Sequence, residues 1–108
     1  MRDVKVPTQT TLNKYGLSQA EWIDMFMAQD GKCPICHKEP KTFKGGEFHI
    51  DHWHVRNWKN MLPEERKRFV RGIVCQWCNR SYLSKGINLT KARNMVIYLE
   101  KFKPLEQS

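Results

Sequence analysis

The hydrophobic residues follow helical spacing in two segments, one near each end of the chain. The first helix is expected to start at Ser18, which can form a capping box with Glu21, and to stop at Gly31. The second is expected to start at a capping Thr90 and to stop at Pro104. The apolar faces consist of Trp22, Ile23, Phe26 and Met27 in the first helix, and of Ala92, Met95, Val96, Leu99 and Phe102 in the second.

Between these helices the pattern changes to shorter elements. Residues 48–54 are read as a short strand and residues 69–74 as its hairpin partner. A brief helix is expected over residues 62–68, with Pro63 in its first turn. A further helix over residues 75–83 would follow the second strand directly. The pattern therefore predicts a small α+β protein.

The chain is expected to form one domain, because 108 residues provide too small a core for two. We predict an N-terminal arm over residues 1–14, irregular up to residue 13, a main domain over residues 15–103 and a tail over residues 104–108. The longest apolar run, Met95 to Leu99, is far too short to span a membrane, and the first residues lack the apolar stretch of a signal peptide. These features predict a soluble, cytoplasmic protein with no membrane partner.

The net charge of +8 is concentrated in the middle of the chain. Residues 1–40 carry five basic and five acidic residues, whereas residues 41–85 carry ten basic and four acidic residues, a net charge of +6. An excess of this kind fits a polyanionic partner. It fits a solvated basic face as well, and charge alone leaves both interpretations open.

The four cysteines form two C-x-x-C pairs that are separated by 38 residues. Such pairs bind one tetrahedral zinc ion without strain, which predicts a structural site. Two disulfides are the alternative, but a reducing compartment disfavours them. His37 completes a C-x-x-C-H pattern typical of covalent haem, although haem would leave the second pair without a role. The predicted zinc ligands are Cys33, Cys36, Cys75 and Cys78.

A second cluster, Asp51-His52-Trp53-His54, contains the groups needed for phosphodiester hydrolysis if Asn79 lies nearby. Asp51 and Asn79 offer oxygen ligands that suit Mg²⁺, and a neutral His52 can take a proton from an attacking water. In a regular strand Asp51 and His52 would point to opposite faces. Both can serve one centre only if the strand ends or bulges there. On its own, the D-H-x-H run is also compatible with a turn or a structural cluster.

Taken together, these residues resemble the recombination endonuclease VII family, a branch of the HNH or His-Me finger nucleases. The resemblance covers most of the chain, from about Tyr15 to Phe102, and depends on the order of the motifs rather than on any one of them. The matching stretches are Tyr15-Gly16-Leu17, Cys33-Pro34-Ile35-Cys36, Ile50-Asp51-His52-Trp53-His54, Val70-Arg71-Gly72-Ile73-Val74-Cys75 and Cys78-Asn79.

The resemblance implies a zinc-stabilised ββα-metal core flanked by N- and C-terminal helices. It also implies a phage-type endonuclease, in the host cytoplasm if phage-encoded, that cleaves branched (Holliday-junction-like) or duplex DNA with Mg²⁺ or Mn²⁺. Asp51 and Asn79 would hold the catalytic metal, His52 would be the general base, and His54 would lie near the scissile phosphate. The family places the acid and the base where the strand gives way to a loop.

Two departures from the family pattern are visible. Tyr82 stands where the best-known member has a helical carboxylate, and tyrosine is a poor metal ligand. The loop from Val55 to Val70 is longer and more basic than the usual link. In it Trp58, like the preceding Trp53, is expected either to stack on bases or to pack into the core. The residues expected to contact DNA are Arg56, Lys59, Arg66, Lys67, Arg68, Arg71, Arg80 and Tyr82.

Three functional hypotheses remain at this stage. A junction resolvase must cut two strands symmetrically, which suggests a C₂ homodimer. A monomeric nicking enzyme or general HNH DNase of phage replication or packaging is the alternative within the same class. A non-catalytic zinc module that binds nucleic acid would explain the cysteines and the charge, but not Asp51, His52 and Asn79.

Overall fold

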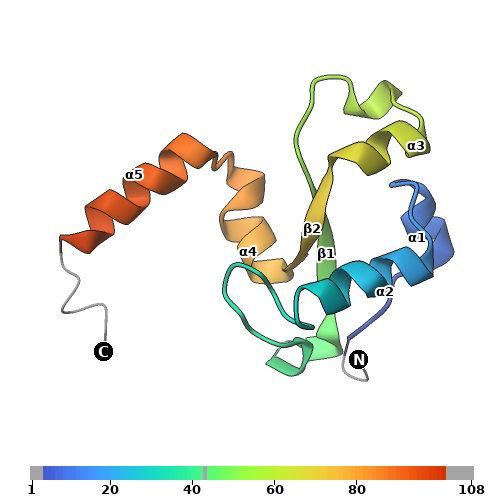
Figure 1. The fold of residues 1–108 in the computed structure, drawn as a ribbon, viewed down its shortest axis with the longest axis horizontal. Helices are drawn as coiled ribbons and strands as arrows, with labels where there is room; N and C mark the ends of the chain where they lie inside the picture. Colours follow the sequence, from blue (N-terminus) through green and yellow to red (C-terminus); the bar gives the residue numbers. More distant parts are fainter. Residues whose placement is uncertain (1–3, 43, 102–108) are drawn as a thin grey trace.

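The computed structural model describes residues 4–42 and 44–101. It has an α+β fold with five α-helices and a single two-stranded sheet within the described residues. Figure 1 shows the hairpin among the first four helices, with α5 apart from it. The helices and strands are α1 (Gln9–Asn13), α2 (Gln19–Ala28), β1 (Phe48–His52), α3 (Pro63–Arg66), β2 (Val70–Cys75), α4 (Gln76–Ser81) and α5 (Leu89–Glu100). Short 3-10 helices lie between them: η1 (Pro40–Thr42), η2 (Lys44–Gly46), η3 (Trp58–Asn60), η4 (Lys67–Phe69) and η5 (Leu83–Lys85).

The sheet is the antiparallel hairpin that the sequence predicts. Its register runs from the pair Phe48–Cys75 at one end to the pair His52–Val70 at the other. The strand expected over residues 48–54 ends at His52, and the second strand continues one residue beyond its expected end. The register shifts between Asp51 and His52, so a β-bulge lies next to the strand end.

The core lies between α2 and the hairpin. The capping box of Ser18 and Glu21 is present at the start of α2, as predicted. Trp22 stacks on Phe26 with ring centroids 5.3 Å apart, and Phe26 meets Phe48 of β1 edge-on, also at 5.3 Å. The buried apolar residues are Val4, Leu12, Leu17, Trp22, Phe26, Cys33, Phe48, Ile73, Val74, Cys75 and Cys78.

Part of the N-terminal stretch expected to be irregular is helical. Thr8 caps α1 by accepting a hydrogen bond from the backbone N–H of Thr11, and Leu12 is fully buried. The following turn needs Gly16, which has φ of +68° and lies against α3. A Cβ atom at this position would lie 2.5 Å from the carbonyl oxygen of Pro63. The contact brings the loop after α1 against the loop that precedes β2.

The last helix differs from its prediction at its start. Asn88, rather than Thr90, is the N-cap, because its side chain accepts the backbone N–H of Lys91 at 2.8 Å. Within α5 the structure describes every residue, and none is buried. Figure 1 shows why, since α5 extends away from the hairpin. The predicted positions Phe102 and Pro104 lie outside the described residues.

Gln29 ties the end of α2 to the middle of β2. Its side-chain amide donates to the carbonyl oxygen of Ile73 at 2.7 Å, and its side-chain oxygen accepts the N–H of the same residue at 2.8 Å. One side chain thus satisfies both backbone groups of a buried strand residue. Over the described residues, no helix has the length and apolar character needed to cross a lipid bilayer.

Candidate metal centre and active site

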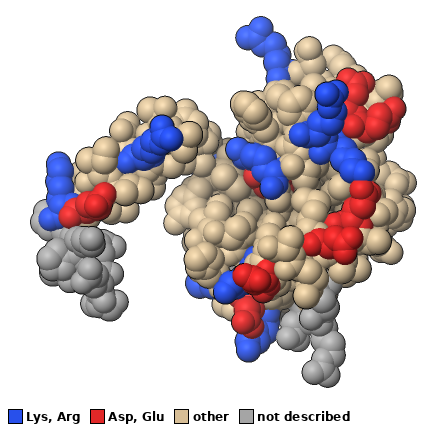
Figure 2. Space-filling model, in the orientation of Figure 1, with Lys and Arg blue, Asp and Glu red and all other residues tan. Residues whose placement is uncertain are grey.

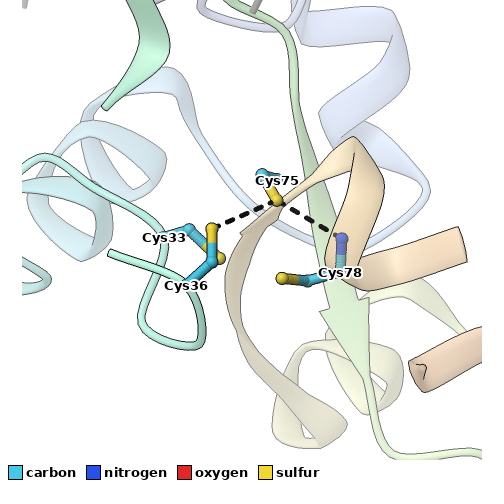
Figure 3. A group of neighbouring side chains, drawn as sticks. All are labelled: Cys33, Cys36, Cys75 and Cys78. Carbon is cyan, nitrogen blue, oxygen red and sulfur yellow. Dashed lines mark hydrogen bonds between the residues drawn. The ribbon is translucent and has the colours of Figure 1, made fainter. Parts of the chain in front are cut away.

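The two C-x-x-C pairs meet in one cluster. Figure 3 shows Cys33 and Cys36, from the loop after α2, facing Cys75 at the end of β2 and Cys78 on α4. The four sulfur atoms lie within 4.8 Å of one another. Tetrahedral zinc with bonds of about 2.3 Å to sulfur would set them about 3.8 Å apart. The donor set and its spacing therefore fit a zinc ion, with only Cys36 exposed.

The structure does not contain the two disulfides that the sequence left as an alternative. All four cysteines lie within the described residues and are free thiols. The sulfur atoms of Cys36 and Cys75 are 3.7 Å apart, far beyond the about 2.05 Å of an S–S bond. His37, which completes the haem-like pattern, is exposed and has a left-handed backbone with φ of +63°.

Local backbone geometry orients the cluster. Cys75 was expected to be the first residue of a helix, but it is the N-cap of α4 and still has strand-like dihedral angles. Its sulfur accepts the N–H of Cys78 at 3.3 Å. Burial raises the pKa of the Cys75 and Cys78 thiols. Burial also acts on Cys33, but hydrogen bonds from backbone N–H groups outweigh it and lower the pKa of that thiol to about 7. A thiolate is the form that binds metal.

Asp51 lies at the other end of β1 and is bound by Arg71. The carboxylate is 6% exposed, and both of its oxygens accept hydrogen bonds from the Arg71 guanidinium, at 2.7 and 3.0 Å. The bulge explains the pairing, because Asp51 faces Gly72 and His52 faces Val70, which leaves Arg71 as the extra residue. The strand therefore both bulges and ends here, which is the condition under which Asp51 and His52 can serve one centre.

His52 is packed among aromatic rings. Its imidazole stacks on the Trp58 indole, with ring centroids 3.8 Å apart and an interplanar angle of 13°. Tyr15 and His54 approach it at tilted angles, at 6.3 and 5.1 Å. Burial lowers the pKa of His52 below its ordinary value of 6.5, and the neighbouring His54 lowers it further, against the opposing charge of Asp51. The ring is therefore neutral at pH 7 and able to accept a proton.

Asn79, on α4, contacts a residue that the sequence analysis missed. Its side-chain nitrogen lies 3.1 Å from Nδ1 of His49, on β1. The two predicted metal ligands thus have different partners in this structure, His49 for Asn79 and Arg71 for Asp51. Strand alternation would have revealed His49, because residues two apart on β1 share a face and His49 precedes Asp51 by two. Both His49 and Asn79 line a cavity of about 390 Å³.

Two further cavities adjoin the site. His54 and Arg71 line one of about 520 Å³ with Trp53, which is 63% exposed and can meet a ligand. The indole of Trp58, by contrast, is already in contact with the rings or charges of His52 and Arg66. Tyr82 is exposed and lines a groove of about 760 Å³ beside α5.

The basic residues expected to contact DNA fall into two groups. Three are engaged within the protein: Arg66 with backbone carbonyls, Lys67 with Glu21, and Arg71 with Asp51. The exposed members of the other group are Arg56, Lys59, Arg68 and Arg80. Figure 2 shows basic side chains interspersed with acidic ones on the surface around α3, so the face in view is not uniformly positive.

The fold and these groups define a class. It is a small α+β protein with a cluster of four thiols that could hold a metal ion at one end of a hairpin, and with an acid and imidazoles at the other. The particular family follows from comparison, because the family model for recombination endonuclease VII matches residues 8–101, and the chain belongs to that family. The resemblance found in the sequence is confirmed. Membership indicates a DNA endonuclease, a nuclease of the hydrolase class. No curated protein and no solved structure matches the chain.

Proposed function

We propose that the protein is a metal-dependent HNH (His-Me finger) endonuclease that hydrolyses phosphodiester bonds in branched or duplex DNA, as a phage-type enzyme. The observation that supports this most is the bulge between Asp51 and His52. The helix α4, which carries Asn79, contacts the same strand two residues before Asp51, through His49. An acid and a neutral imidazole at a strand end, together with an amide on a helix that contacts this strand, are the groups that hydrolysis needs.

The cysteine cluster would hold one structural zinc ion per chain. Cys33 and Cys36 lie on a loop with little regular structure, whereas Cys75 and Cys78 connect β2 to α4. Zinc would therefore fix the helix that carries Asn79 relative to the hairpin. Structural zinc contributes on the order of 10–16 kcal/mol to folding. That is comparable to the about 5–15 kcal/mol of net stability of a whole domain.

His52 is the proposed general base. A ring that is neutral at pH 7 can take a proton from water as the water oxygen attacks phosphorus and the bond to the leaving oxygen breaks. An imidazole accepts a proton at a nitrogen in the plane of the ring, so the stack on Trp58, which covers one face, is compatible with this role. His54, exposed at the adjoining cavity, is the proposed contact to the scissile phosphate.

The donors fit a hard divalent cation. Asp51 offers a carboxylate and Asn79 an amide oxygen, the ligand types that Mg²⁺ or Mn²⁺ prefers. When bound, the ion would supply charge neutralisation at the scissile phosphate. Arg71 donates one hydrogen bond to each oxygen of Asp51 here, so a metal ion would either use the remaining lone pairs or displace the guanidinium. A released guanidinium is a bidentate phosphate ligand, which supports Arg71 as a DNA contact.

The remaining DNA contacts are proposed from exposure. Phosphate contacts need accessible cations, and Arg56, Lys59, Arg68 and Arg80 meet that condition. Lys67 can contribute only by leaving Glu21, and Arg66 only by releasing the loop that it holds. Tyr82 would donate to a phosphate.

Symmetric cleavage of a junction would require a homodimer, and α5 is the proposed interface. Met95, Val96 and Leu99 are exposed and line the groove beside α5, opposite Ile35 and Leu83. A second copy would cover this apolar face. A monomer at micromolar concentration, measured by sedimentation velocity, would instead support the nicking or general DNase alternative.

The decisive experiment is a cleavage assay on supercoiled plasmid, linear duplex and a four-way junction. We expect strand breaks with Mg²⁺ or Mn²⁺ that disappear with a chelator. His52→Ala should lower the rate by about 10²–10⁴, the usual contribution of a general base, with an unchanged melt. Full activity of this variant would remove His52 from the mechanism, and the substrate cut fastest identifies the preferred DNA structure.

One observation favours a second candidate, the non-catalytic zinc module that binds nucleic acid. Asp51 and Asn79 are each engaged by a side chain of the protein, as in a purely structural network. DNA binding without any metal-dependent cleavage would establish this alternative.

A further inference from the structure

The loop between the strands carries a tryptophan that lies flat on the imidazole of His52. The centroids of the Trp58 and His52 rings are 3.8 Å apart and the planes differ by 13°. This is closer and more parallel than the other ring contacts of His52, with Tyr15 at 6.3 Å and His54 at 5.1 Å. Trp58 therefore has more influence on the orientation of this ring than either neighbour.

Trp58 is itself held in place from several sides. The Arg66 guanidinium lies 5.4 Å from the indole centroid, and Tyr15 lies on another side with its ring centroid at 6.0 Å. Arg66 also donates to three backbone carbonyls, those of Trp58 at 3.0 Å, Lys59 at 3.1 Å and Lys14 at 3.1 Å. One guanidinium thus ties the backbone of the 3-10 turn η3, which carries Trp58, to the turn after α1, so the backbone from which the indole projects is fixed.

We propose that Trp58 is a positioning residue that fixes the imidazole plane of His52 for proton transfer. The proposal depends on the proposed role of His52 as general base. A histidine near the end of a strand has two free side-chain torsions, so its ring samples several orientations unless a neighbour selects one. The ring nitrogens exchange protons in the plane of the imidazole, so a stack that fixes this plane also restricts the directions in which they can meet water and substrate.

Simple core packing does not account for this contact. Trp58 is only partly buried and does not belong to the buried core cluster around Trp22 and Phe26. Its ring contacts are with an imidazole, a guanidinium and a phenol. Loss of the indole should consequently affect the orientation of His52 more than the stability of the domain.

The stack has a spectroscopic signature that needs no DNA. In protein with ¹³C-labelled histidine, the ring protons of His52 should resonate upfield of those of His37, His49 and His54, because they lie above the indole. His52→Gln assigns the signal. Trp58→Leu should move it to the position of an unstacked histidine, Trp58→Phe should keep most of the displacement, and Trp77→Leu, which removes an exposed tryptophan on α4, should leave it unchanged.

Cleavage kinetics test the consequence, well below the melting temperature of each variant. We expect Trp58→Leu to lower kcat by about 10- to 100-fold, the scale for a misplaced catalytic group, with KM nearly unchanged. Trp58→Phe should restore most of kcat. The proposal is overturned if His52 shows no upfield displacement in the wild type, or if Trp58→Leu loses the displacement and keeps full kcat.

These failures differ from a failure of the proposed function. If His52→Ala cleaves as fast as the wild type, the general base is another group, and Trp58 then has no ring to position for the reaction even though the stack persists. If the displacement is absent while His52→Ala is inactive, the proposed function stands and only the role of Trp58 is lost.

Discussion

The two ends of the β1–β2 hairpin are stabilised by different means. At the end where Phe48 pairs with Cys75, the neighbours are buried apolar side chains and four thiols. At the end where His52 pairs with Val70, they are a ring stack, an ion pair and hydrogen bonds from Arg66 to carbonyl groups. Burial stabilises one end, and a metal ion held by the thiols would add to it, whereas polar contacts order the other end. The proposed catalytic end must be ordered and still accessible to water, and directional contacts such as hydrogen bonds, ion pairs and ring stacks can order it without burying it.

The largest effect should come from breaking the buried end. Cys75→Ser removes one of four predicted zinc ligands at a fully buried position, so most of the about 10–16 kcal/mol of zinc stabilisation should be lost. We expect loss of a cooperative thermal melt, followed by circular dichroism. A strong chelator should have the same effect on the wild type and little further effect on the variant. A normal melt for Cys75→Ser would contradict the structural role of zinc.

Gly16→Ala should be the most damaging change at the proposed catalytic end. The residue has φ of +68°, and the new Cβ would lie 2.5 Å from the Pro63 carbonyl oxygen. A strained left-handed residue costs about 1–3 kcal/mol before the steric contact is counted. Gly86→Ala is the matched control, because Gly86 has φ of +83° but nothing within 4 Å of its added Cβ. Urea denaturation should show the larger loss for Gly16→Ala, and equal losses would mean that the contact with Pro63 has no energetic weight.

Arg66→Met should have an intermediate effect at the same end. It removes three donors to backbone carbonyls while keeping much of the hydrophobic stem, and we expect a loss of about 1–3 kcal/mol in unfolding free energy. Lysine cannot reproduce the planar fork, so Arg66→Lys should not restore the loss. Arg68→Met, at an exposed position, serves as control in the same urea titration. Equal stability of the two Met variants would show that the carbonyl contacts do not hold the loop.

The smallest effect should come from Glu21, which pairs with Lys67 across the surface between α2 and η4. The hydrogen bond from Lys67 lowers the pKa of Glu21 below its ordinary value of 4.5. The folded state therefore favours the charged form, and this contribution is present above about pH 4.5 and is lost as the pH falls further. Glu21→Gln should melt almost like the wild type at pH 7, because solvent screens exposed pairs. A clear loss at pH 7 would show that this surface pair matters for the loop.

Local signals in the sequence predicted the elements whose contacts are local. The capping box of Ser18 and Glu21 and the place of Pro63 at the start of α3 follow from residues a few positions apart, and each strand of the hairpin follows from its own short run of residues. The cysteine cluster was predictable over a longer separation, because four thiols in two pairs have one shared use. The start of α5 was not, because Asn88 and Thr90 are both good caps and only the structure distinguishes them.

Contacts between distant segments account for what the sequence did not reveal. The Arg66 bond to the Lys14 carbonyl joins residues 52 positions apart, and the Asn79 contact with His49 joins residues 30 positions apart. Neither pair leaves a periodic pattern in the sequence. The ionic partner of Asp51 was hidden for another reason, because Arg71 reaches it only where the register shifts by one residue. The apolar positions of α5 follow helical spacing, yet that spacing does not tell whether the covering surface belongs to the same chain.

The side chain of Gln29 has a consequence beyond tying a helix to a strand. A hairpin of two strands has two unpaired edges, and an exposed edge is a template on which other chains can add strands and aggregate. The Gln29 amide makes hydrogen bonds to both backbone groups of Ile73, as a residue of a neighbouring strand would. The middle of the β2 edge is therefore not available for pairing with a strand of another chain. This contact should therefore reduce the tendency of so small a sheet to aggregate through its edge.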